Sequence, residues 1–135
     1  MPVKNPLKYL LFAALILGVG IFWMTLSAPG INDLPGNFRE IDSWQNENNT
    51  GPVHRVYIVT VSDTLWRSME DYGNYMPYSK LGTTNVYFFL EDQPFPNQIT
   101  PGEVPFPAVY QKACVGRYYK NHMKVIQMIK RPFQD

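Results

Sequence analysis

The chain has 135 residues, of which 45% are hydrophobic, 15% aromatic and 17% charged, and its formal net charge is +1 at pH 7. This much apolar and aromatic surface excludes a disordered tail, whereas the near-neutral charge by itself excludes little. After subtraction of one hydrophobic segment and the polar stretch behind it, fewer than ~90 residues remain for a core, which limits the chain to one compact domain.

The most distinctive feature is an apolar run over residues 9–28. No charged side chain occurs between Tyr9 and Ala28, and a helix of this length, at about 1.5 Å per residue, matches the roughly 30 Å hydrocarbon core of a bilayer. Pro29 and Gly30 end the helix. The run predicts one membrane-spanning helix that contacts membrane lipid through residues 9–28 and tethers the rest of the chain.

The charges on either side of this run predict its orientation. Lys4 and Lys8 precede it, whereas the residues that follow are mainly acidic: Asp33, Glu40, Asp42 and Glu47, against the single Arg39. The positive-inside rule then places residues 1–8 in the cytoplasm and the bulk of the chain outside it. A cleaved secretory signal, which would leave a secreted domain, is the alternative, although the run exceeds the usual signal core and proline follows it directly.

Residues 29–52 are rich in Pro, Gly, Asn, Glu and Asp, which predicts a polar spacer. Apolar residues nevertheless recur there at spacings of three and four: Ile31, Leu34, Phe38, Ile41 and Trp44. This spacing is compatible with a short amphipathic element that docks on the domain or at the membrane surface. The number of helix breakers favours a loop with one or two docked side chains.

Residues 53–135 are expected to form an extracytoplasmic α+β domain that begins with a βαβ unit. Val53 to Val61 is rich in β-branched and aromatic residues and predicts a strand inside the sheet. Ser62 to Thr64 offers N-cap chemistry, with Asp63 as a capping residue, and helical spacing continues to Met76. Thr84 to Glu91 predicts the next strand, and a helix between two such strands favours a parallel pair.

The C-terminal part is less regular. Residues 93–107 contain five prolines and predict a loop, and residues 108–119 are ambiguous, because the first half suits a helix and the second a strand. A turn at 120–123 and a strand at 124–130 follow. These features favour a closing β-hairpin on a small mixed sheet, with a ferredoxin-like βαβαβ arrangement as the alternative.

No catalytic, metal or cofactor signature is visible. The two histidines, His54 and His122, and the single Cys114 belong to no motif that fixes a metal or a nucleophile. A hairpin could bring Cys114 to His122, but a lone cysteine between apolar neighbours is far more often a packing residue. The glycines are isolated, which argues against a phosphate cradle and a bound nucleotide. We therefore expect no cofactor, no metal and no enzymatic activity.

Two surfaces are candidates for binding. The first is basic, because no acidic residue lies between Glu103 and Asp135; Lys120 and Lys124 would present this charge on the hairpin to an acidic protein or to anionic headgroups. The second is the aromatic end of the helix, where Tyr75 and Tyr78 are the residues outside the apolar spacing. In both cases ordinary solvent exposure or packing is the commoner fate of such residues.

The expected function is that of a non-catalytic accessory or adaptor subunit, held by its helix and docked on a membrane or envelope protein. The alternative is a small ligand-binding module or minor enzyme at the membrane surface, which would use the aromatic turn or Cys114. A nucleic-acid partner is disfavoured by the predicted side of the membrane. No stretch carries a motif that identifies a known family.

Overall fold

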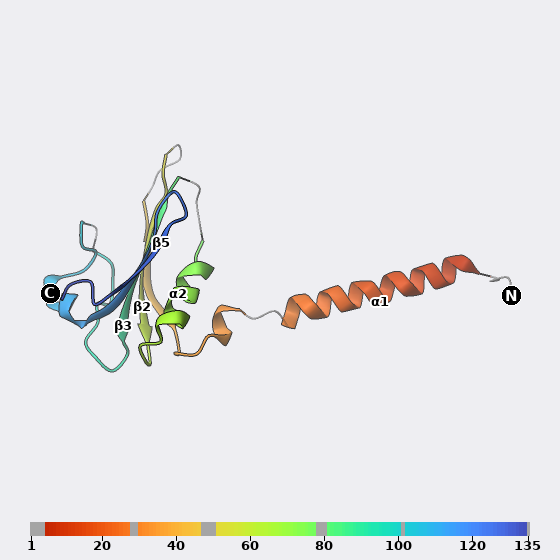
Figure 1. Ribbon diagram of the computed structural model, residues 1–135, viewed down its shortest axis with the longest axis horizontal. Coiled ribbons are helices and arrows are strands. Elements are labelled where there is room, and N and C mark those ends of the chain that lie inside the picture. Colours follow the sequence, from red (N-terminus) through yellow and green to blue (C-terminus); the bar gives the residue numbers. More distant parts are fainter. Residues whose placement is uncertain (1–4, 28–29, 47–50, 78–80, 101, 135) are drawn as a thin grey trace. The chain divides into compact units, whose positions relative to one another are not determined.

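The computed structural model describes residues 5–27, 30–46, 51–77, 81–100 and 102–134, so Tyr78 lies outside the described residues. It divides into two compact units, residues 1–30 and residues 31–135. The first contains the helix α1, and the second contains a mixed sheet with one helix packed on it (Figure 1).

Helix α1 runs from Pro6 to Ser27. Its stretch from Pro6 to Met24 is apolar, entirely exposed and long enough to cross a membrane, properties that a signal sequence would share. The helix begins before the apolar run that starts at Tyr9, because proline suits the first turn of a helix, where its missing N–H group costs nothing.

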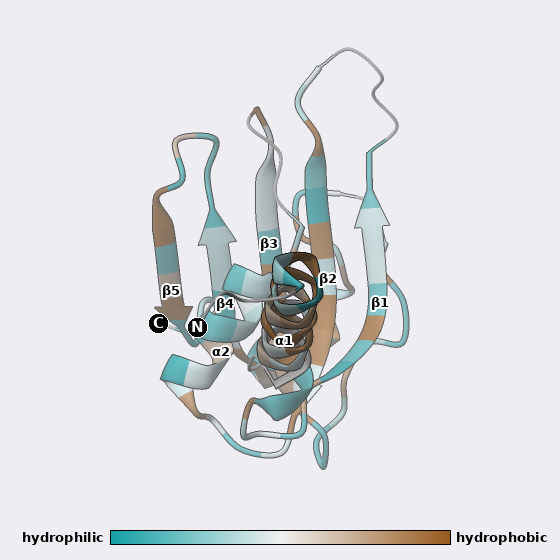
Figure 2. Ribbon diagram, turned by 90° about the vertical axis from the view of Figure 1, so that its right-hand side faces the viewer, coloured by the Kyte–Doolittle hydropathy of each residue, from teal (hydrophilic) through white to brown (hydrophobic). Residues whose placement is uncertain are grey.

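The described residues of the second unit form five strands and one α-helix in the order β1 (Arg39–Gln45), β2 (His54–Val61), α2 (Trp66–Tyr75), β3 (Thr83–Leu90), β4 (Cys114–Lys120) and β5 (Ile126–Lys130). The strands lie side by side in that same order, with α2 across one face (Figure 2). Strands β2 and β3 are parallel, and the other neighbouring pairs are antiparallel. The α+β class, the βαβ unit and the closing hairpin are confirmed, and the ferredoxin-like alternative is wrong.

The polar spacer expected over residues 29–52 differs from the structure in its middle part. Residues 39–45 form the edge strand β1, which pairs antiparallel with β2 and carries a bulge between Glu40 and Asp42. The bulge breaks the two-residue alternation that reveals a strand in a sequence, and an edge strand tolerates charges on its exposed side. Before β1, a 3₁₀ turn (η1, Ile31–Asp33) and Phe38 pack against the core beneath α2.

Helix α2 starts later than the sequence indicates. Its N-cap position is Leu65, which makes no capping bond through its side chain, so the capping role expected of Asp63 is wrong. The Asp63 carboxylate instead accepts a hydrogen bond from the Thr64 N–H at 2.7 Å, a local turn interaction that competes with helix initiation. The helix ends before Met76, as Pro77 requires.

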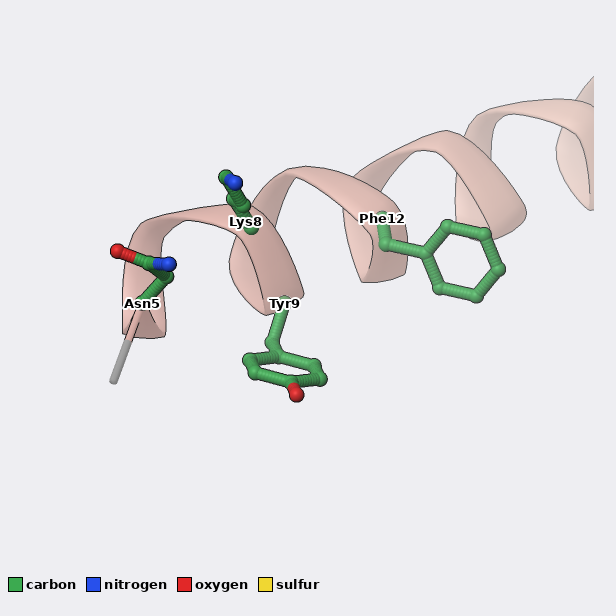
Figure 3. Close-up of a pocket in the computed structure, with 4 residues that line it drawn as sticks. All are labelled: Asn5, Lys8, Tyr9 and Phe12. Carbon is green, nitrogen blue, oxygen red and sulfur yellow. The ribbon is translucent and has the colours of Figure 1, made fainter. Parts of the chain in front are cut away.

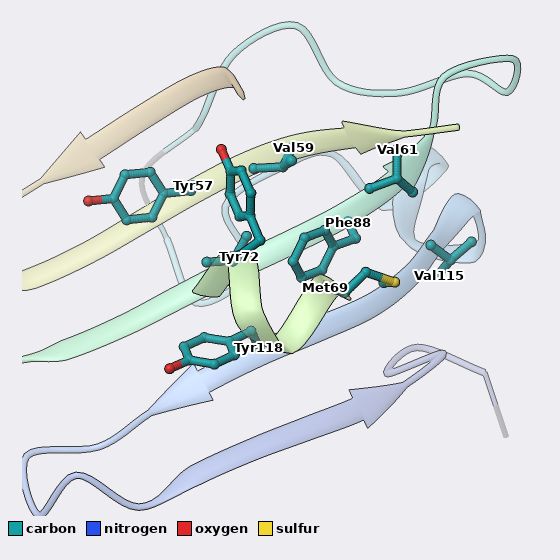
Figure 4. Close-up of a cluster of buried hydrophobic side chains, with 9 residues drawn as sticks. Tyr57, Val59, Val61, Met69, Tyr72, Phe88, Val115 and Tyr118 are labelled. Carbon is teal, nitrogen blue, oxygen red and sulfur yellow. The ribbon is translucent and has the colours of Figure 1, made fainter. Parts of the chain in front are cut away.

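The larger core lies between α2 and the sheet (Figure 4). Tyr72 stacks on Phe38 with ring centroids 4.8 Å apart, and both rings meet the edge of Phe88 at 6.1 Å. The Tyr118 hydroxyl donates to Asn74 Oδ1 at 2.7 Å and so ties the end of α2 to β4. This core is formed by Tyr57, Val59, Val61, Met69, Tyr72, Val86, Phe88, Val115 and Tyr118.

A second core lies on the opposite face, where Figure 1 shows loops and the short 3₁₀ helix near the C-terminus in place of an α-helix. Phe106, from the proline-rich loop, makes edge contacts with Tyr87 at 5.2 Å and Phe89 at 5.3 Å, and Phe133 stacks on Tyr87. The ambiguous residues 108–119 divide into a 3₁₀ helix (η2, Ala108–Ala113) and β4. The described part of the loop is thus a lid over the C-terminal ends of β2 and β3.

Gly73 offers a test of how closely α2 lies on the sheet. A Cβ atom at this position would overlap the ring of Tyr118, which is fully buried. Alanine in a helix normally stabilises by about 1 kcal/mol over glycine, but overpacking of this severity costs about 3 kcal/mol, so we expect Gly73→Ala to lower the free energy of unfolding by about 2 kcal/mol. The measurement is urea unfolding followed by circular dichroism.

The matched control for this substitution is Gly30→Ala, because a Cβ atom at Gly30 meets nothing within 4 Å. It should leave the urea midpoint unchanged. A Gly73→Ala variant as stable as the parent protein would contradict the close contact between α2 and β4.

Candidate functional site

The residues predicted to bind a partner lie towards one end of the domain. Tyr75 is the last residue of α2 and is 48% exposed, Lys120 is the last residue of β4, and Lys124 lies in the turn before β5 with a φ of +64°. Tyr78 falls outside the described residues.

Two contacts bring the ends of α2 and β4 together. Asn74, next to Tyr75, accepts the hydrogen bond from Tyr118, which lies two residues before Lys120. Thr84 pairs with Lys120 in the sheet register, and its hydroxyl donates to the Pro77 carbonyl at 3.5 Å. The aromatic end of the helix and the basic hairpin are therefore neighbours in the fold, although they are far apart in the sequence.

The possible pairing of Cys114 with His122 does not occur. Cys114 begins β4 and His122 lies beyond its other end, so at about 3.3 Å per residue roughly 20 Å or more separates them. The thiol is buried and donates to the Gly116 carbonyl at 3.3 Å. Burial raises the pKa of the Cys114 thiol from its usual 9.0 to about 12, so the reactive thiolate is scarce at neutral pH.

Two hollows in the described part of the chain are open to solvent. The first is a notch along one side of α1, where Asn5, Lys8, Tyr9 and Phe12 project outward at helical spacing (Figure 3). The second is a depression of about 370 Å³ in the proline-rich loop. Its lining residues carry neither charge nor thiol and are Pro96, Asn97, Gln98, Thr100, Pro107 and Tyr110.

Among the described residues, no group of three His, Cys, Asp or Glu side chains lies close enough to hold a metal ion.

The strongest candidate for a binding surface lies on the face of the sheet opposite α2. It is the half of that face that lies beyond the lid. A single register row crosses all five strands there, since each residue pairs with the next: Trp44, Val56, Asn85, Tyr119 and Gln127. Side chains alternate along a strand, so this row shares the face of Ile58 and Tyr87. Trp44 is 38% exposed, and the three central residues of the row are half-buried.

Arg117 lies on the same face, beside this row. Its Nε and Nη2 atoms donate to Asn85 Oδ1 at 3.0 and 2.6 Å. Its guanidinium carbon lies 5.6 Å from the ring centre of Tyr87 and 5.1 Å from that of Tyr119. We call the surface formed by Trp44, Val56, Asn85, Arg117, Tyr119 and Gln127 the open face.

The sequence does not predict the open face, although Arg117 belongs to the stretch between Glu103 and Asp135 that contains no acidic residue. Arg117 and Tyr119 alternate on a predicted strand, which places them on one side of the sheet. The sequence does not join Trp44 to them, because the composition of its segment predicts a spacer. Only the strand order, with β1 at one edge and β4 three positions away, brings these residues onto one surface.

Comparisons with known proteins found no match: no family model, curated protein or solved structure matches the chain.

Cys114 is the only cysteine, so thiol labelling reports on it alone. At pH 8, a pKa of about 12 instead of 9.0 lowers the thiolate fraction about 1000-fold. We expect an aromatic disulfide reagent to react at least about 1000-fold more slowly with the native protein than with the protein unfolded in guanidinium. Native labelling within tenfold of the unfolded rate would contradict the buried, protonated thiol.

Proposed function

We propose that this chain is a single-pass membrane protein whose extracytoplasmic domain acts as a non-catalytic adaptor by docking on another membrane or envelope protein through its open face. The observation that carries the proposal is the row from Trp44 to Gln127, which is exposed at its two ends and half-buried between them, whereas Ile58, Tyr87 and Phe89 on the same face are buried.

The chemistry of the open face supports docking. A sheet face turned to water is normally polar, whereas here the large apolar or aromatic side chains of Trp44, Val56 and Tyr119 interrupt the polar residues. Trp, Tyr and Arg are the residues most enriched at the energetic centres of protein interfaces. A rigid sheet also presents them without the entropic cost of ordering a loop.

The adaptor role is supported by the state of the chain's one thiol. Cys114 is buried and its raised pKa keeps it protonated, which argues against the thiol-enzyme alternative.

The membrane role is supported by α1, whose apolar side chains are exposed throughout Pro6–Met24. Outside a bilayer, so large an exposed apolar surface would favour aggregation. The Lys4 and Lys8 charges favour a cytoplasmic N-terminus and therefore an extracytoplasmic domain.

The anchor is tested by charge placement. We expect the protein to remain in membranes after alkaline carbonate washing. Its mass should be that of the uncleaved chain, with or without the first methionine. Ile16→Arg with Val19→Arg, near the middle of α1, should release most of the protein, because each central arginine costs about 3 kcal/mol of insertion. The control pair Asn5→Arg and Leu7→Arg, near the end of the helix, should stay in the membrane.

Two results would count against this proposal. Recovery of a shortened chain in the wash would indicate a cleaved signal. Protection of the domain from protease added outside intact spheroplasts would reverse the orientation.

Docking is tested by comparing two exposed apolar residues on opposite faces of the sheet. Trp44 is 38% exposed on the open face, and Leu65, at the start of α2, is 36% exposed. We expect Trp44→Ala to reduce the yield of a cross-linked partner about tenfold or more, as truncation of an interface centre does, and Leu65→Ala to leave it unchanged. Quantitative cross-linking in native membranes, followed by mass spectrometry, gives both yields.

An equal yield from the two variants would argue against docking through the open face. Thermal unfolding of each variant provides the check that the domain is intact.

A further inference from the structure

Among the contacts between described residues, one edge of the Arg117 guanidinium has no hydrogen-bond partner. An arginine carries five N–H donors in a planar fork. Asn85 Oδ1 accepts from Nε and from Nη2, so it occupies the side edge of the fork. The remaining edge, formed by Nη1 and the second Nη2 hydrogen, has the spacing that accepts the two oxygens of one carboxylate.

The same contacts hold the fork in one orientation. Asn85 fixes the position of Nε and Nη2, while the rings of Tyr87 and Tyr119 lie 5.6 and 5.1 Å from the guanidinium carbon. Tyr87 is itself packed against Phe106 and Phe133. A guanidinium held in this way loses little further freedom when it binds a ligand.

The charge of Arg117 is not balanced by these contacts, since an amide oxygen and two phenol rings are all neutral. Asp42 belongs to the register row of Tyr87 and Arg117, but three strand spacings, roughly 14 Å, separate it from Arg117. Its two carboxylate oxygens accept hydrogen bonds from the Ser43 and Ile99 N–H groups at 2.9 and 2.8 Å.

We propose that Arg117 is the specificity residue of the open face and binds the carboxylate of an Asp or Glu side chain in an acidic segment of the partner protein. This inference rests on the proposed docking function and names its ligand. One guanidinium matches the single charge of a carboxylate. The aromatic and amide groups of Trp44, Tyr119 and Gln127 can contact the residues of a peptide that neighbour the acidic one. A free anion has no such neighbouring residues.

The experiment is a nuclear magnetic resonance titration of the ¹⁵N-labelled full chain in zwitterionic detergent micelles. The probe is a blocked tripeptide with glutamate between two phenylalanines, and its counterpart has glutamine in the centre. We expect the glutamate peptide to shift the Arg117 Nε–H signal and the amide signals of Asn85 and Tyr119. The glutamine peptide should bind at least tenfold more weakly, because it cannot form the charge-assisted pair with Arg117.

Three variants assign the effect to the guanidinium fork. Arg117→Gln should weaken binding of the glutamate peptide at least tenfold, and Arg117→Lys should recover only part of it, because lysine keeps the charge but lacks the fork. Arg67→Gln removes the same charge from an exposed position on α2, the opposite side of the sheet, and should leave binding unchanged.

Asn85→Asp provides a second route if Arg117→Gln does not fold. It keeps the size of the side chain and neutralises Arg117 within the chain, so the fold should persist while the affinity for the glutamate peptide falls.

The inference would be overturned if the two peptides bound equally well, or if the shifted signals lay away from the open face. It would also be overturned if Arg67→Gln weakened peptide binding as much as Arg117→Gln, or if Asn85→Asp left the affinity for the glutamate peptide unchanged. A larger response of the Arg117 signal to inorganic phosphate or to vesicles containing anionic lipid would assign the site to phosphate.

The cross-linking assay separates this inference from the docking function. If Trp44→Ala releases the partner but Arg117→Gln retains it, docking stands and the carboxylate ligand is wrong. If neither variant releases the partner, the docking function itself fails.

Discussion

The constraint on which this domain depends is that its two central strands are apolar on both faces, while the chain supplies one helix to cover them. Strands β2 and β3 form a parallel pair, and the connection between parallel strands crosses one face. Helix α2 covers that face, and Gly73 lets it approach Tyr118 closely. The other face is covered by loop residues and the short 3₁₀ helix η2, with Phe106 buried at the centre of that cover and Phe133 packed beside it.

The lid formed by the proline-rich loop covers only part of this face, and the uncovered part is the open face. The proline-rich loop packs over the ends of β2 and β3 that hold Ile58 and Phe89, and the row from Trp44 to Gln127 lies beyond it. Arg117 lies at the boundary, where the packed ring of Tyr87 supports one side of its guanidinium. The same aromatic residue thus belongs to the core and positions a charged group at the surface.

Other features of the chain bear on the role that we propose. The thiol that the sequence offered as a nucleophile serves as an apolar core residue, because Cys114 begins a buried strand under Phe89 and Phe106. The basic hairpin and the end of α2 lie together through the contacts of Tyr118 and Thr84. A helix that meets the length and hydropathy requirements of a membrane span would hold these surfaces near a partner at high local concentration.

The sequence by itself determined the features that depend on local pattern: the apolar helix, the βαβ unit, the end of α2 at Pro77 and the β4–β5 hairpin. These were predictable because hydrophobic period and proline act over a few residues. The tertiary structure decided that residues 39–45 form a strand, because a bulged edge strand is stabilised by its neighbour and not by its own composition. It also decided that Trp44, Asn85 and Arg117 share one surface, since strand order depends on long-range pairing that no local pattern encodes.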